Sequence, residues 1–135
     1  MKTPEYYESD ILRFFDGRPL ELSLYQRLFQ RMEELFPDAS VKPQKSQVSF
    51  YGQHLFAAAS LPVRRKKDWP EHCILVTFGL QERKSSPRIA VAVEPYPNRW
   101  THHVVVSEEA QIDEELLGWL QEAFAFSQSK GRRRK

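Results

Sequence analysis

The segment NRWTHHVVV, at residues 98–106, groups side chains that can bind an anion or move a proton. Arg99 is a permanent cation, Trp100 supplies an aromatic surface, and His102 titrates near neutral pH. Neighbouring side chains of a β-strand point to opposite faces, so Trp100 and His102 share one face, and Arg99 and His103 share the other. Because valines follow on the first face, we expect that face to turn inward and to take His102 with it.

Two roles are open for His102. In the first, it is a partly buried imidazole that hydrogen-bonds to backbone or to a carboxylate. In the second, it is a site residue that binds an anion or acts as a general acid or base. His103 is expected at the surface beside Arg99. Since adjacent strand residues diverge, the two histidines are not expected to hold one metal ion.

Lys45 is a second cation that we assign to the same candidate site. It precedes the strand-like run QVSFY, and next to an inward His102 it would help to form an anion pocket. Alone, a lysine at this position would be a solubilising residue at a sheet edge. The predicted ligand is a small acidic molecule or a nucleic-acid backbone. The predicted ligand-binding residues are Lys45, Arg99, Trp100 and His102.

The run RRKK offers an alternative site for nucleic acid. It lies in the polar connection at residues 62–72, which we expect to form a hairpin loop, and an aromatic residue follows it. A basic loop that carries an aromatic ring can contact a phosphate backbone and a base, although such loops are also commonly just solvated. The residues of this alternative site are Arg64, Arg65, Lys66, Lys67 and Trp69.

Several classes of chemistry have no sequence support. The chain contains no CxxC, HExxH, GxGxxG or GxxxxGK pattern, so we expect no metal and no nucleotide cofactor. Cys73 is expected to be a small buried apolar residue rather than a nucleophile. An enzyme that uses His102 as general acid or base, with Lys45 stabilising charge, stays open. We favour a non-catalytic binding or interaction module.

Composition indicates one globular domain. The chain has 135 residues and a net charge of +2, but the charge is uneven. Residues 39–106 carry ten basic and four acidic side chains, whereas residues 107–129 carry six acidic and no basic ones. Either the basic segment meets an anionic partner, or it pairs with the acidic segment inside the fold. The first residues lack an apolar signal region, no stretch could span a membrane, and the single cysteine is typical of a reducing compartment, so we expect a cytoplasmic protein.

Hydrophobic periodicity predicts the elements that would position these residues. A short helix is expected to begin with Ser9 as its N-cap and to stop at Gly17, followed by helices over residues 20–36 and 112–127. Between the last two lie five or six strands. The connections at 62–72 and 81–87 are expected to be hairpin-like, which predicts an antiparallel meander. The expected fold is a single α+β domain over residues 1–129, with a basic, disordered tail at 130–135.

Seven segments, in this order, resemble a family of small bacterial domains of unknown function, sometimes labelled predicted transport proteins. They are FFDGRP, LYQRLFQRMEEL, VKPQKSQVSF, FAAASLP, ILVTFGL, RWTHHVVV and IDEELLGWLQEAF. The resemblance covers approximately residues 11–126. It places Lys45, Ser46 and Phe50 on a K-[ST]-x-[IV]-x-F pattern, and Trp100 and His102 on a W-x-H pattern. It implies a helix–strands–helix fold and carries no assigned activity.

Overall fold

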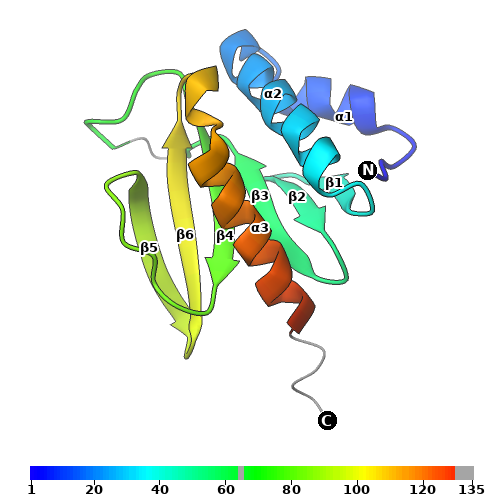
Figure 1. Ribbon diagram of the computed structural model, residues 1–135. Coiled ribbons are helices and arrows are strands. Elements are labelled where there is room, and N and C mark those ends of the chain that lie inside the picture. Colours follow the sequence, from blue (N-terminus) through cyan, green and yellow to red (C-terminus); the bar gives the residue numbers. More distant parts are fainter. Residues whose placement is uncertain (64–65, 130–135) are drawn as a thin grey trace.

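The structure, a computed structural model, describes residues 1–63 and 66–129 (Figure 1). Two helices precede the strands and one follows them, as expected. Arg64 and Arg65 of the proposed basic loop, and the expected tail at 130–135, lie outside the described residues. The elements are α1 (Tyr7–Phe14), α2 (Pro19–Leu35), β1 (Ser40–Pro43), β2 (Val48–Tyr51), β3 (Leu55–Ser60), β4 (Ile74–Leu80), β5 (Ile89–Tyr96), β6 (Arg99–Val106), a short 3₁₀ turn (Glu109–Gln111) and α3 (Glu114–Ser129).

The first two helices follow their sequence signals at most positions. α2 begins at Pro19, whose ring fixes a helical φ and whose missing N–H is not needed in the first turn. α1 is followed by Gly17 with φ +72°, a left-handed conformation that glycine adopts without strain. The expected N-cap at Ser9 is wrong. The N-cap is Tyr6, and the Ser9 hydroxyl lies inside the helix and donates to the Tyr6 carbonyl at 3.1 Å.

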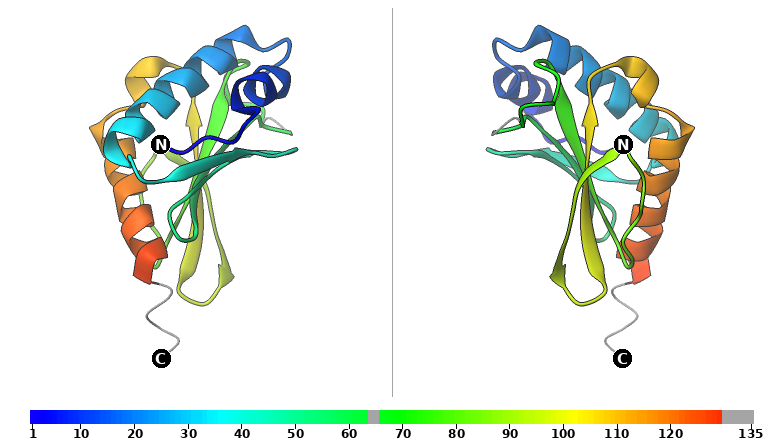
Figure 2. Two further views of the ribbon diagram at one scale, coloured as in Figure 1. Left: turned by 90° about the vertical axis from the view of Figure 1, so that its right-hand side faces the viewer. Right: turned by 90° about the vertical axis from the view of Figure 1, so that its left-hand side faces the viewer.

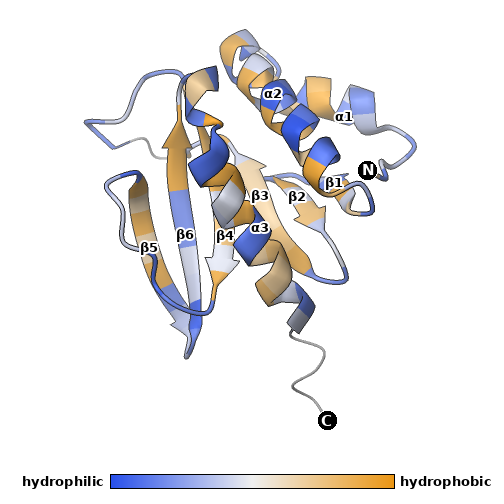
Figure 3. Cartoon of the chain, in the orientation of Figure 1, coloured by the Kyte–Doolittle hydropathy of each residue, from blue (hydrophilic) through white to orange (hydrophobic). Residues whose placement is uncertain are grey.

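The strands form one antiparallel sheet in the order β1-β2-β3-β4-β6-β5, which confirms the α+β class. Figure 2 shows all three helices on the same side of this sheet, and no helix on the other side. The helix-covered face is the core: the inward rows of β4 and β6 include Ile74, Val76, Val104 and Val106, each at most 1 % exposed. Figure 3 shows hydrophobic stretches in the strands, whereas the middle of β6 is hydrophilic.

The connection between β4 and β5 is not the hairpin that the sequence indicated. Residues 81–88 pass the end of β6, which lies between β4 and β5, and the hairpin is formed by β5 and β6 instead. β6 is the more buried strand on its inner face, whereas β5 is half-exposed and carries Pro95, which suits an edge strand. A strict meander therefore holds only from β1 to β4.

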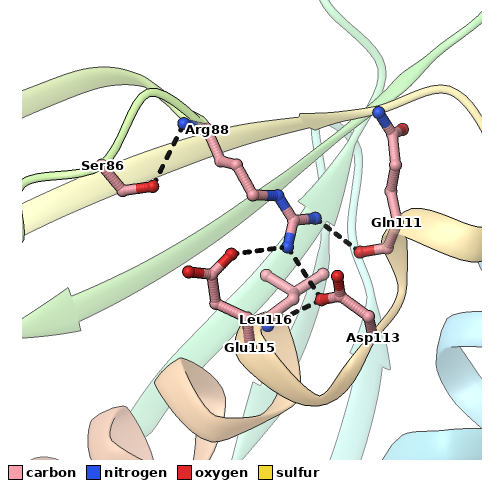
Figure 4. A network of polar contacts seen from close by, with 6 residues as sticks. All are labelled: Ser86, Arg88, Gln111, Asp113, Glu115 and Leu116. Carbon is pink, nitrogen blue, oxygen red and sulfur yellow. Dashed lines mark hydrogen bonds and ion pairs between the residues drawn. The ribbon is translucent and has the colours of Figure 1, made fainter.

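Ion pairs fasten this connection to α3. The Arg88 guanidinium donates to the Asp113 carboxylate at 2.8 Å, to Glu115 at 3.1 Å and to the Gln111 carbonyl at 2.6 Å (Figure 4). Lys84 Nζ contacts the Glu122 carboxylate at 3.0 Å. Part of the basic middle segment thus pairs with the acidic final helix inside the fold, one of the two explanations left open by the charge distribution.

Candidate ligand-binding site

His102 lies on the helix-covered face and is completely buried. Its Nε2 accepts a hydrogen bond from the Lys84 backbone N–H at 2.9 Å, and its ring stacks on Phe78 with centroids 5.1 Å apart. Burial, reinforced by the nearby Lys84 charge, lowers the pKa of His102 because the charged form loses its hydration. The ring is therefore neutral at pH 7 and holds the 81–88 connection against the sheet, as in the first of the two roles considered for it.

That connection also places a cation beside Trp100. The Arg83 guanidinium lies over the indole ring, 5.8 Å from its centroid, while Trp100 itself is half-buried near the start of β6. A guanidinium over an indole face is a favourable cation–π contact. Trp100 is thus held between the covered face of the sheet and a positive charge.

A hollow of about 220 Å³ opens where β3 and β4 part. Pairing between these strands stops at Ala57 and Phe78, although β4 continues through Gly79 and Leu80, which pair only with β6. The end of the hairpin between β5 and β6 contributes the opposite wall. The hollow is lined by Gln47, Leu55, Phe56, Ala57, Ala58, Thr77, Phe78, Gly79, Leu80, Pro95, Tyr96, Arg99, Trp100, Thr101 and Phe126.

Arg99 is the single charged residue in this lining. Its side chain is half-buried, and no hydrogen bond, ion pair or ring contact to it is found within residues 1–63 and 66–129. The other arginines in this part of the chain each contact a carboxylate, an amide or a ring. Those residues are Arg13, Arg18, Arg27, Arg31, Arg83 and Arg88.

The uncovered face of the sheet supplies hydroxyl groups to the same place. Thr77 lines the hollow, and its Oγ1 lies 2.9 Å from Nδ1 of His103 on the neighbouring strand. His103 is half-buried rather than fully at the surface, and burial lowers its pKa. Thr101, two residues before it on the same face, also lines the hollow.

Lys45 lies apart from the other predicted site residues. It is exposed in the turn between β1 and β2, and it lines a different hollow with Asp10, Arg13 and Phe14. β2 lies three strands from β6 in the sheet, which corresponds to about 14 Å at the usual strand spacing. Arg99 and Trp100 therefore share one hollow, Lys45 lies near another, and His102 lies under the sheet and lines neither.

The lining includes residues that the sequence did not single out, above all Gly79, Thr77 and Tyr96. Gly79 carries the clearest signal, because a glycine inside the strand-like run ILVTFGL often marks a place where another group approaches the backbone. Thr77 and Tyr96 carry no such signal, since their part in the hollow depends on which strands are neighbours.

In the alternative loop, the described residues form a tight turn. The Trp69 backbone N–H donates to the Lys66 carbonyl at 3.0 Å, and Lys66 Nζ lies 5.8 Å from the centroid of the Trp69 ring. Lys67 is exposed beside them. A cation and an aromatic ring are therefore adjacent in this loop, as the sequence indicated.

The model of one family, a domain of unknown function called DUF5655, matches residues 13–127. The chain belongs to the DUF5655 family. This confirms the resemblance to a family of unknown function, and every residue that lines the Arg99 hollow lies inside the DUF5655 match. No curated protein and no solved structure matches the chain.

Three further observations on this DUF5655 domain concern metal ligands, membrane spans and the cysteine. Within residues 1–63 and 66–129, no three His, Cys, Asp or Glu side chains gather closely enough to bind a metal ion. Among the helices described, none has the length and apolar character that a membrane span requires. Cys73 is buried, as expected, with 2 % of its surface exposed.

Proposed function

We propose that this domain is a non-catalytic binding module that holds a small anionic ligand in the hollow beside Arg99 and Trp100. The observation that carries the proposal is the half-buried residue Arg99, whose side chain has no partner among the described residues and whose neighbours in the lining are all uncharged. A guanidinium presents N–H donors in a planar fork that fits a carboxylate or phosphate with two parallel hydrogen bonds.

The surroundings of Arg99 favour an anion over a cation. No carboxylate lines the hollow, and Arg83 adds a second positive charge over the Trp100 ring. Charges act more strongly where apolar walls exclude water, so a single ion pair in this hollow is worth more than the same pair on an open surface.

His102 and Lys45, the other two predicted site residues, have indirect roles in this proposal. His102 positions the connection that carries Arg83, through the hydrogen bond from the Lys84 backbone. Lys45 is too distant for contact with a small ligand in the hollow, and we expect it to contribute only a weak, screened field.

Calorimetric titration with a panel of small anions tests this function. We expect Arg99→Gln to weaken binding about 10-fold or more, because the charge-assisted hydrogen bonds are lost. Arg27→Gln, which removes an arginine that contacts only Gln30 on α2, is the matched control. Lys45→Ala is expected to bind as the wild type does. Equal affinities of the Arg99 and Arg27 variants would refute the proposal.

Nucleic-acid binding through the loop at 62–72 is the second candidate, and the contact between Lys66 and Trp69 favours it. It predicts an affinity for oligonucleotides that falls steeply with added salt and with replacement of Lys66 and Lys67 by glutamine. A catalytic function of His102 has less support, because Nε2 already accepts the Lys84 N–H and the ring has no exposed surface.

A further inference from the structure

We infer that the ligand of the Arg99 hollow is a small aromatic carboxylic acid that lies on the backbone at Gly79. This rests on the proposed function and goes further, because it names the class of anion. The inference depends on the shape of the floor, on the walls, and on the number of charges.

The floor is made of residues with little or no side chain. Ala58 and Gly79 both line the hollow, and Gly79 lies between two residues, Phe78 and Leu80, that point to the buried face. By alternation, a side chain at 79 would project to the uncovered face, beside Thr77 and Thr101. Its absence leaves a gap in the side-chain layer of the sheet. A flat ring fits such a gap, since its face can approach the backbone closely.

One wall of the hollow on this face is aromatic. Tyr96, at the end of the hairpin between β5 and β6, is 64 % exposed, although a residue of this size is more often covered. Trp100, on β6, also lines the hollow, although strand alternation directs its side chain to the covered face. Aromatic rings prefer offset-stacked or edge-to-face contacts with one another, so an aromatic guest on this face would gain contacts with the Tyr96 ring.

The single cation of the lining favours an anion with one charge. A phosphate monoester carries a charge of about −1.5 to −2 at pH 7 and most nucleotides carry more, whereas the lining offers one cation. A long-chain fatty acid needs a deeper cavity than about 220 Å³, which is below the usual range for ligands of drug size. A ring with one carboxylate matches both the single guanidinium and the small, largely apolar space.

The test compares four probes with the wild-type protein in calorimetric titrations: phenylacetate, the neutral phenylacetamide, acetate and inorganic phosphate. We expect phenylacetate to bind more tightly than each of the others, by about 10-fold or more over phenylacetamide, which lacks the charge. Acetate has the charge and lacks the ring, so its weaker binding would report the aromatic contribution.

Gly79→Val fills the floor and is the decisive variant. The added Cβ would have only the Trp100 carbonyl oxygen near it, at 3.9 Å, and valine favours strands, so the fold should be retained. We expect about 10-fold weaker binding of phenylacetate, because the ring loses its place on the backbone. Gly118→Ala on α3, where a Cβ meets nothing within 4 Å, is the control and should bind normally. If the valine variant fails to fold, Gly79→Ala replaces it.

The outcomes separate this inference from the function on which it rests. If phosphate or acetate binds as tightly as phenylacetate, or if Gly79→Val binds phenylacetate as the wild type does, the aromatic class is wrong while anion binding stands. If none of the three anions binds the wild-type protein at millimolar concentration, the proposed function fails and this inference fails with it.

Discussion

His102 joins the sheet to the 81–88 connection through one hydrogen bond in a site without solvent. The neutral ring accepts the Lys84 N–H at Nε2, so its proton is on Nδ1, which has no partner in the described part of the chain. Protonation of Nε2 would remove the acceptor and place a charge in the core. The same burial lowers the pKa of His103 on the other face. Both histidines therefore bind protons less readily in the folded than in the unfolded chain.

This difference predicts acid-sensitive stability. A histidine of the unfolded chain titrates at about pH 6.5, and the two buried ones titrate lower in the folded state. Their contribution is complete above about pH 6.5 and is lost as the pH falls below it, because the unfolded state then binds more protons. Urea unfolding at about pH 8 and at about pH 5 should show this loss. His102→Gln should flatten the pH dependence, and His54→Gln, which changes an exposed residue, should leave it unchanged. If the free energy of unfolding depends on pH equally in the His102→Gln and His54→Gln variants, burial of His102 is not the cause of the acid sensitivity.

The 81–88 connection is the element on which the proposed site depends. Lys84 in its middle and Arg88 at its end attach it to α3 and the segment before α3, and it carries Arg83 to the Trp100 ring. Burial acts to raise the pKa of Asp113, but the Leu116 N–H and Arg88 outweigh it and lower that pKa. The contacts of Arg88 with Asp113, Glu115 and the Gln111 carbonyl, which we call the Arg88 clamp, therefore hold an ionised carboxylate at the start of α3. The helix dipole also favours negative charge there.

Removal of the Arg88 clamp should lower the free energy of unfolding measurably. The carboxylates of Asp113 and Glu115 are 44 % and 52 % exposed, so each ion pair alone contributes little. With the hydrogen bond to the Gln111 carbonyl included, we expect Arg88→Met to lower the free energy of unfolding by about 1–2 kcal/mol. Arg27→Met on α2 should change it by less than about 0.5 kcal/mol. Urea unfolding measures both, and equal values would show that the clamp is not stabilising.

Element types could be predicted from sequence better than element order. The helices and all six strands follow hydrophobic periodicity and turn residues. The position of β6 between β4 and β5 does not, because a polar connection of seven residues fits a hairpin and a crossing equally well. Pro95 in β5 was the available signal, since proline is tolerated at a sheet edge and not in a central strand.

At the scale of the whole molecule, the lining of the hollow could be predicted only in part. Arg99 and Trp100 were found from residue type, and they do share a hollow. Lys45 was grouped with them although strand order places it three strands away. Gly79 was missed although a glycine inside a strand-like run is a local signal, because its place in the hollow depends on where pairing between β3 and β4 stops.

The most direct test of the whole account is a titration of the ¹⁵N-labelled protein with phenylacetate, followed by NMR. We predict that the largest chemical-shift changes occur at the backbone amides of Gly79 and Thr101 and at the Arg99 Nε–H, with the amides of Lys45 and Lys66 unchanged. Changes centred on Lys45 or on the loop at 66–72, or none at millimolar phenylacetate, would contradict an aromatic-acid site at Arg99.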